Sequence, residues 1–446
     1  MIIRIKYLIL CLVAILLFSM CTKTETDKPN GDEEIVDPKD PANPTRKTTF
    51  DGKYYHDVPF DGWETEAKLR AELMKDIKWI PLAAVQKSAM SASDVFNSGT
   101  EYIGVPYSDG GPTMGFIGRD VSFHTFLSAV NNPKSYLYTA PTVNDNGHRY
   151  PYFGSTCSAA VEYIWGLPSI LATSVIYKNR APDIVKRKES QDMKNLQLFD
   201  AFCYYTDKSS EGHIFMVYDI ARDEDGNIKE IVIIEERTPI FMTTKYTPAA
   251  LKKRIEDISV PVYIYELAQE YTLPAFMEKN IDEIDKIFPD ALCPARGNKS
   301  TFAYGKDIEI NILSQDYESI EIYNNDALYQ TDKISGETMA YNSLPIGQYK
   351  ARLIGSGKTS SFAYFEVCNP SYTVKLNGRR LYINCPANTT PSFMTINDNV
   401  ITHALPFKHT ANGEWYYDGD LGAATHCRVR FAGKYGTYMA NSIKFK

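Results

Sequence analysis

The pattern of the last third of the chain, from about residue 300 to residue 446, predicts strands and few helices. Its apolar runs are short and are separated by Gly, Asn, Asp and Ser, as at residues 308–313, 320–323, 349–354 and 363–367. This spacing is typical of short antiparallel strands joined by tight turns. We expect a β-sandwich domain over residues 299–369. Residues 370–446 have the same pattern of short apolar runs separated by turn residues. This pattern predicts a second β-sandwich domain or a continuation of the first.

A different pattern stands near the middle of the chain. Thr156-Cys157-Ser158 leads into a short apolar run with helical spacing, which Gly166 and Pro168 end. Cys157 then lies in the first turn of a helix, where free backbone N–H groups and the helix dipole favour a thiolate and could stabilise an oxyanion. The alternative interpretation is a buried structural cysteine.

Strand patterns follow this helix. Residues 196–205 are apolar, residues 213–220 are rich in β-branched and aromatic side chains, and residues 230–234 return after a turn at Asp225-Gly226. One helix followed by a strand and a hairpin predicts an α+β arrangement for this part of the chain.

The hairpin carries the residues that a cysteine nucleophile needs, namely a base and a polar group that orients the base. His213 is the best candidate for the base, since it follows a polar turn and opens a strand. Either Glu235 or Glu236 lies near it, and loop length decides which one, because side chains alternate along a strand. A two-residue loop pairs residue 213 with residue 238 and favours Glu236, whereas one more loop residue favours Glu235.

Four short motifs together resemble the NlpC-type cell-wall peptidases, a family with the papain-like cysteine peptidase fold. They are Gly104-Val105-Pro106-Tyr107 with Gly110-Gly111, Cys157-Ser158, Asp200-Ala201-Phe202 and Gly212-His213-Ile214, and Ile234-Glu235 falls where the family has its third polar residue. The resemblance covers residues 95–240. It implies an α+β, papain-like (NlpC-type) catalytic domain, which we place at residues 49–298, followed by one or two small antiparallel β-sandwich domains.

The resemblance also implies roles for individual residues. Cys157 would be the nucleophile, His213 the general base and acid, and Glu235 the group that orients His213. Tyr107 and Ser158 would help to bind the substrate. The family's usual reaction is hydrolysis of an amide in the peptide stem of peptidoglycan. No paired CxxC, HExxH or glycine-rich phosphate loop is present, so we expect no metal ion and no cofactor.

The N-terminus resembles a bacterial lipoprotein signal. A basic start and an apolar run over residues 7–18 are followed by Cys21, which would be acylated and become the mature N-terminus. Residues 1–21 are then the signal peptide, and the acidic, Pro-rich residues 22–48 are a disordered tether. We expect a lipid-anchored protein of the bacterial cell envelope, in the periplasm or at the cell surface.

Composition narrows the choice of partners. The net charge is −7 and basic residues form no patch with interleaved aromatic residues, so we expect no nucleic-acid partner. The main hypothesis is an exported, lipid-anchored cysteine hydrolase with a Cys-His-Glu triad. Two alternatives are a non-catalytic surface lipoprotein that binds glycan or protein, and a thiol hydrolase that acts on a different amide or an ester. The oligomeric state and a Cys368–Cys385 disulfide are left open.

Overall fold

The computed structural model describes residues 46–87, 93–108, 115–119, 121–139, 151–167, 171–209, 211–268, 270, 292–294, 301–360, 362–369, 371–385, 389–396, 408–410, 414–418, 421 and 423–446. The predicted signal peptide, Cys21, residues 22–45 of the predicted tether and Gly110-Gly111 lie outside these residues. The last three tether residues, 46–48, are described, and Thr48 begins a strand. Among the described helices, none is long and apolar enough to cross a membrane.

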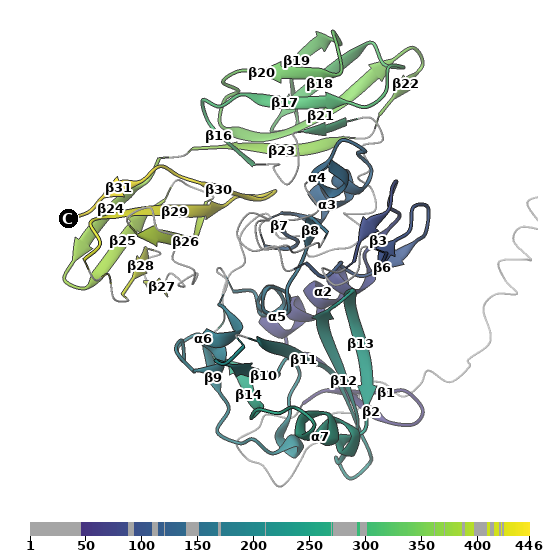
Figure 1. The fold of residues 1–446 in the computed structure, drawn as a ribbon, viewed down its shortest axis with the longest axis vertical. Helices are drawn as coiled ribbons and strands as arrows, with labels where there is room; N and C mark the ends of the chain where they lie inside the picture. Colours follow the sequence, from purple (N-terminus) through teal and green to yellow (C-terminus); the bar gives the residue numbers. More distant parts are fainter. Residues whose placement is uncertain are drawn as a thin grey trace, which may run out of the picture.

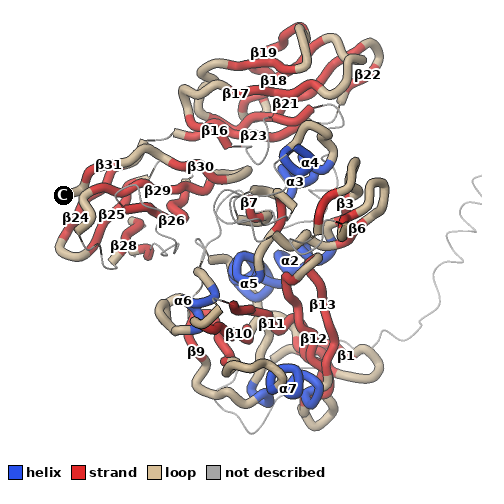
Figure 2. Tube along the Cα trace, viewed as in Figure 1, coloured by secondary structure: helices blue, strands red, loops and turns tan. Residues whose placement is uncertain are grey.

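The described part of the protein is mostly β, with 43% of the described residues in strands and 17% in helices, and Figure 2 shows how the strands are spread over it. The expected fold class is therefore wrong: a papain-like α+β catalytic domain is not shown. The physical reason lies in the first half of the chain, where an eight-stranded sheet and three two-stranded ribbons outweigh a few short helices, of which the longest described has 14 residues.

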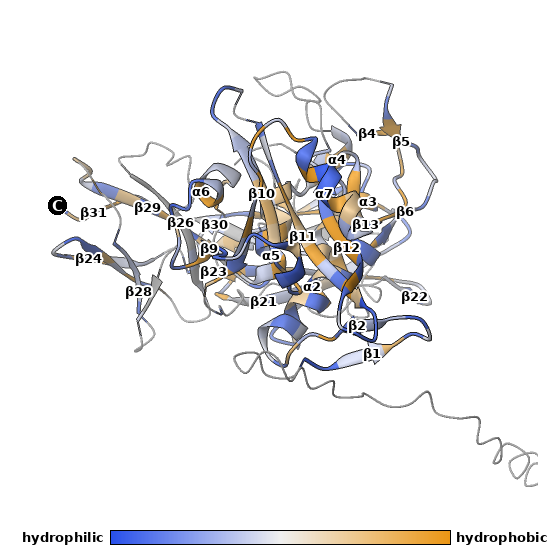
Figure 3. Cartoon of the chain, turned by 90° about the horizontal axis from the view of Figure 1, so that it is seen from below, coloured by the Kyte–Doolittle hydropathy of each residue, from blue (hydrophilic) through white to orange (hydrophobic). Residues whose placement is uncertain are grey.

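The first half of the chain is built on an antiparallel sheet with the order β1-β2-β11-β10-β14-β9, to which β12 and β13 are added beyond β11. Figure 3 shows that the apolar residues of this half gather on its central strands, β10 to β12. The strands are β1 (Thr48–Phe50), β2 (Tyr55–Asp57), β9 (Val185–Arg187), β10 (Ala201–Thr206), β11 (Glu211–Arg222), β12 (Ile228–Arg237), β13 (Ile240–Tyr246) and β14 (Tyr263–Leu267).

Short helices and ribbons surround this sheet (Figure 1). The helices are α2 (Trp63–Asp76), α3 (Phe123–Val130), α4 (Tyr136–Thr139), α5 (Cys157–Trp165), α6 (Thr173–Tyr177), α7 (Pro248–Glu256) and the 3₁₀ turn η2 (Met193–Asn195). The ribbons pair β3 (Lys78–Trp79) with β6 (Tyr102–Ile103), β4 (Val85–Gln86) with β5 (Val95–Phe96), and β7 (Gly115–Phe116) with β8 (Phe153–Gly154).

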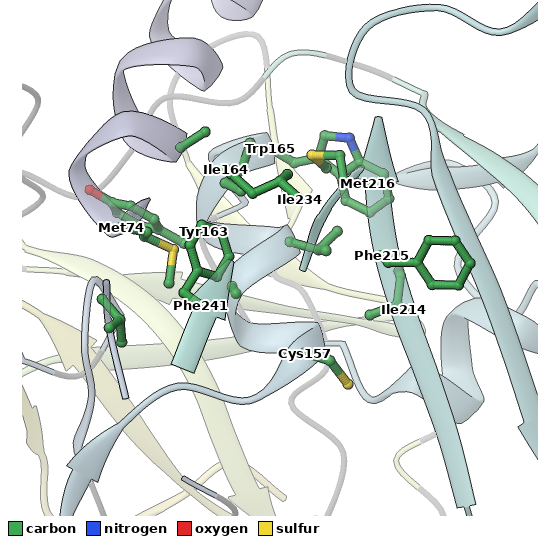
Figure 4. Close-up of a cluster of buried hydrophobic side chains, with 14 of the residues drawn as sticks. Met74, Cys157, Tyr163, Ile164, Trp165, Ile214, Phe215, Met216, Ile234 and Phe241 are labelled. Carbon is green, nitrogen blue, oxygen red and sulfur yellow. The ribbon is translucent and has the colours of Figure 1, made fainter. Parts of the chain in front are cut away.

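Helix α5 packs against one face of the sheet. Figure 4 shows Ile164 and Trp165 of α5 beside Met216 and Ile234, whereas Phe215 points to the opposite side of β11. At the end of α5, the buried guanidinium of Arg70 donates two hydrogen bonds to the Ile164 carbonyl, at 2.9 and 2.7 Å. A cation that satisfies a C-terminal carbonyl also favours the helix dipole. Helix α2, which carries Arg70, thus holds the far end of the helix that begins at Cys157.

Two sandwiches form the rest of the molecule, each from two sheets around its own buried cluster. The first contains β15 (Leu292–Pro294), β16 (Thr301–Ala303), β17 (Ile308–Ile312), β18 (Ser319–Asn324), β19 (Ala327–Lys333), β20 (Thr338–Tyr341), β21 (Gly347–Gly355), β22 (Lys358–Thr359) and β23 (Ala363–Cys368). The second contains β24 (Thr373–Asn377), β25 (Arg380–Asn384), β26 (Thr390–Ile396), β27 (Lys408–His409), β28 (Trp415–Tyr417), β29 (His426–Ala432), β30 (Thr437–Met439) and β31 (Ile443–Lys444).

The predicted β-sandwich character is therefore confirmed. The exact domain boundaries stay predictions, because residues 295–300 and 370, next to which they fall, lie outside the described residues. Cys368 and Cys385 are both free thiols, so they do not form the disulfide that the sequence left open.

Candidate active site

The nucleophile candidate stands at a well-defined helix start. Thr156 is the N-cap of α5, and its hydroxyl accepts a hydrogen bond from the Ala159 N–H at 3.3 Å. At the other end, Gly166 has φ 75°, a left-handed conformation that favours glycine, and it ends the helix. Cys157 and Ser158 are the first two residues of α5 and are mostly buried. Their backbone N–H groups have no acceptor within the helix, as in any first turn.

The structure brings Cys157, His213 and Glu235 together. The Cys157 thiol and the His213 imidazole lie close enough to shift each other's pKa. His213 Nε2 lies 2.9 Å from Glu235 Oε2, which leaves Nδ1 as the nitrogen available to the thiol. The three side chains come from α5, β11 and β12, so two layers of the fold meet at this point. Thiol, imidazole and carboxylate follow one another in this order.

Two further groups contact the sulfur of Cys157. Thr173 Oγ1, at the start of α6, lies 3.9 Å away, and the backbone N–H of Ile214 also acts on the thiol and lowers its pKa. Burial raises the pKa of the thiol, but the interaction with His213, the positive charge of His213 and these two groups together lower it below the usual value. The arrangement therefore favours a thiolate beside an imidazolium.

The pKa of His213 is raised and that of Glu235 is lowered. Burial lowers the pKa of His213, but interactions with Cys157 and Glu235 raise it to about 9. Burial raises the pKa of Glu235, but hydrogen bonds from His213 and Arg254 lower it to about 2. At neutral pH His213 and Glu235 are thus charged, and the imidazolium favours a thiolate on Cys157.

The Glu235 carboxylate has a second partner that sequence reasoning missed. Arg254 of α7 donates to both of its oxygens, at 3.1 and 2.7 Å, and its guanidinium lies over the Phe215 ring, 4.3 Å from the centroid. Glu235 has no exposed side-chain surface, and a buried carboxylate needs such compensation. The start of a helix at Thr247-Pro248 is readable from the sequence, but nothing in the pattern indicates that the sixth residue after Pro248 reaches Glu235.

The turn and two bulges together decide which glutamate meets His213. Next to the turn, Arg222 pairs with Ile228, which is the register of the longer loop. Lys229 is then an extra residue on β12 and Tyr218 an extra residue on β11, and these two shifts cancel. Residue 213 therefore faces residue 237, and Glu235 shares the face of His213.

Glu236 points to the other face of the sheet and is fully buried. In the part of the chain that the structure describes, neither of its carboxyl oxygens has a hydrogen-bond partner. Burial raises the pKa of Glu236 well above its usual value, and the nearby Cys157 charge raises it further. Glu236 is therefore a neutral acid at physiological pH and does not orient His213.

Tyr107 lies next to the segment that leads into Cys157. Its backbone forms a parallel bridge with Ser155, and its N–H donates to the Pro239 carbonyl at 2.9 Å. This approach depends on Gly154, where a Cβ atom would overlap Ser108 and the Pro106 carbonyl. The backbone position suits a residue that lines the site, and the binding roles of Tyr107 and Ser158 stay predictions.

Comparisons with known proteins give no family for this chain. No family model matches it, and no curated protein matches it. Among solved structures, it is similar to fibronectin(III)-like modules of CbhA from Clostridium thermocellum, with 19% identity over 34% of this chain and 92% of that chain, at a TM-score of 0.20. It is also similar to the titin I-band fragment I67-I69, with 12% identity over 35% of this chain and 63% of that chain, at a TM-score of 0.19.

A third similar structure is a glycosyl hydrolase family 2 member from Bacteroides cellulosilyticus DSM 14838, with 11% identity over 31% of this chain and 24% of that chain, at a TM-score of 0.13. TM-scores of this size show no common fold over the whole chain. No function is transferred from these three proteins.

Proposed function

We propose that this protein is a cysteine hydrolase that cleaves an amide bond, with the peptide stem of peptidoglycan as its substrate. One observation carries the proposed hydrolase: at the start of a helix, the Cys157 thiol lies beside the His213 imidazole, whose Nε2 is 2.9 Å from Glu235 Oε2. A thiol, an imidazole and a carboxylate in this order are the groups that nucleophilic acyl transfer needs. The peptidoglycan substrate is taken from the resemblance of the motifs around these residues and not from a family fold.

In the first half of the reaction, the Cys157 thiolate attacks the carbonyl carbon of the amide. The negative charge that develops on the carbonyl oxygen is stabilised by the free backbone N–H of Cys157 in the first turn of α5. His213, already an imidazolium, gives its proton to the leaving nitrogen. The C–N bond breaks, the amine departs, and the acyl group remains on Cys157 as a thioester.

In the second half, the neutral His213 removes a proton from a water molecule, which attacks the thioester carbonyl. The C–S bond breaks, the carboxylic acid departs, and the thiolate–imidazolium pair is restored. Glu235 keeps His213 in one orientation throughout, and Arg254 keeps Glu235 charged. In the cell, we propose that a lipid on Cys21 holds the enzyme at the envelope, where peptidoglycan lies.

The test is turnover by the full chain in mild detergent. Purified peptidoglycan, soluble stem peptides and simple aryl esters are incubated with the wild type, with Cys157→Ala and with Glu236→Gln as a matched control. We expect new amino and carboxyl ends from peptides with the wild type and with the control, and none with Cys157→Ala. Cleavage of esters alone would indicate that the substrate is an ester and not an amide. If Cys157 is reactive but no substrate is cleaved, a binding protein is favoured.

A further inference from the structure

The charges at the β12 end of the site do not balance. Arg237 follows Glu236 at the end of β12, and its guanidinium lies 3.6 Å from Glu235 Oε1. The same carboxylate already accepts two shorter hydrogen bonds from Arg254 and one from His213. Two arginines therefore share one carboxylate, and Arg237 is the more distant of the two.

The other charged groups around the thiol leave this excess in place. The His213 imidazolium faces the Cys157 thiol and favours its ionisation. Glu162 and Glu236 are fully buried, which raises the pKa of both carboxyl groups, and Arg119 beside Glu162 is itself buried and offers no accessible charge. Glu211 is an exposed carboxylate on β11, but it accepts a hydrogen bond from Ser209 in the turn toward β10, away from β12. Arg237 thus stays an exposed, incompletely neutralised cation at the β12 end of the site.

Arg237 is also accessible, since 52% of its side chain is exposed, whereas 21% of the Arg254 side chain is. The contacts run in series from Cys157 through His213 and Glu235 to Arg237, so Arg237 lies on the same side of the thiol as His213. The proton that His213 gives goes to the leaving amine, and the leaving group must therefore lie on this side.

We propose that Arg237 binds a carboxylate on the leaving group, so that the preferred substrates are amides whose amine product is an amino acid or short peptide with a free carboxylate. This inference rests on the proposed thiol hydrolysis and specifies its substrate. A guanidinium suits this role because it binds carboxylates with paired, directed hydrogen bonds.

Two alkylating reagents test the inference without a known substrate: N-iodoacetyl-alanine, which carries a carboxylate, and N-iodoacetyl-alaninamide, its neutral counterpart. Their reactive carbons are alike, so a difference in the rate of Cys157 alkylation reports recognition of the charge. Rates are measured by mass spectrometry of the Cys157 peptide from the full chain. The variants are Arg237→Gln, Arg237→Lys and, as a matched control, Arg180→Gln, because Arg180 is another exposed arginine and has no contact with Glu235 in any described interaction.

We expect the carboxylate reagent to react roughly threefold to fivefold faster with the wild type at low ionic strength, where exposed charges are least screened. The ratio should fall toward one in Arg237→Gln and persist in Arg237→Lys and Arg180→Gln. Equal rates in the wild type, or the same ratio in Arg237→Gln, would overturn the inference while leaving the hydrolase intact. A Cys157 that reacts with both reagents like an ordinary thiol would overturn the proposed function itself.

Discussion

His213 Nε2 lies 2.9 Å from Glu235 Oε2, and this contact depends on the register between β11 and β12. Two bulges, at Tyr218 on β11 and at Lys229 on β12, cancel each other. The register of the turn, in which Arg222 pairs with Ile228, therefore places Glu235 on the face of His213 and sends Glu236 into the core against α5. Two adjacent glutamates therefore have different chemistry: Glu235 is charged and has three hydrogen bonds, whereas Glu236 is neutral and has none in the described part of the chain.

The first prediction compares these two glutamates. Glu235→Gln removes the negative charge that holds the proton on His213, so the pKa of Cys157 should rise and hydrolysis should fall by at least about tenfold. Glu236→Gln should leave both properties close to those of the wild type. The rate of hydrolysis and the pKa of Cys157, measured on both variants, test this difference between the two glutamates. Equal losses in the two variants would mean that Glu235 does not orient the base.

A second prediction concerns the cost of keeping Glu236 inside the protein. Burying a carboxyl group without hydrogen bonds is unfavourable by about 1–3 kcal/mol. Glu236→Leu, which replaces the carboxyl group by an apolar side chain, should therefore raise the free energy of unfolding by an amount of this order. Urea denaturation of the wild type and the variant measures it. A loss of stability would indicate that the Glu236 side chain has favourable contacts that a leucine cannot replace.

Arg254 is expected to act through Glu235 and not on the substrate. Arg254→Met leaves a buried carboxylate with weaker compensation, and we expect the free energy of unfolding to fall by about 3 kcal/mol. The pH profile of turnover should shift as well, because a less stable carboxylate holds the His213 proton less firmly. Arg254→Lys keeps the charge and should recover part of both effects. A variant that unfolds like the wild type and keeps its pH profile would contradict this role.

The pKa of Glu235 also predicts how stability depends on pH. Its folded value, about 2, is below the unfolded value of 4.5, so its ionisation stabilises the folded state above the unfolded pKa. That contribution, about 3 kcal/mol, is lost as the pH falls from about 5 toward 2. The difference in unfolding free energy between the wild type and Glu235→Gln should shrink over this range. A difference that is constant with pH would contradict the assignment.

The sequence predicted the local elements of the site better than the fold around them. The helix that begins at Cys157 is capped by Thr156 and ended by Gly166, and such end signals depend on near neighbours in the chain. His213 on a strand followed from β-branched and aromatic content, which is also local. The choice between Glu235 and Glu236 could not be made in this way, because neither the loop length nor the bulges at Tyr218 and Lys229 leave a mark in the hydrophobic pattern.

The fold class failed for a related reason. The motifs from Gly104 to Glu235 resemble those of a known family, but a motif reports the few residues around it and not how the intervening chain packs. Strands β12 and β13 extend the sheet beyond β11, and ribbons such as β7 with β8 occupy segments that read as loops. Arg254 shows the same limit, since its contact with Glu235 depends on how α7 packs against the sheet.

The most direct test of the account is the pH dependence of iodoacetamide labelling of Cys157 in the full chain, beside His213→Ala. The account predicts that the wild-type thiol titrates well below the free-thiol value of about 8.5, with a second change near pH 9, where His213 loses its proton. In His213→Ala the thiol pKa should rise above that of the wild type, because burial then acts on the thiol without a positive charge beside it. A Cys157 that titrates as an ordinary or a buried thiol, and that does not respond to the loss of His213, would contradict the thiolate–imidazolium pair and with it the proposed hydrolase.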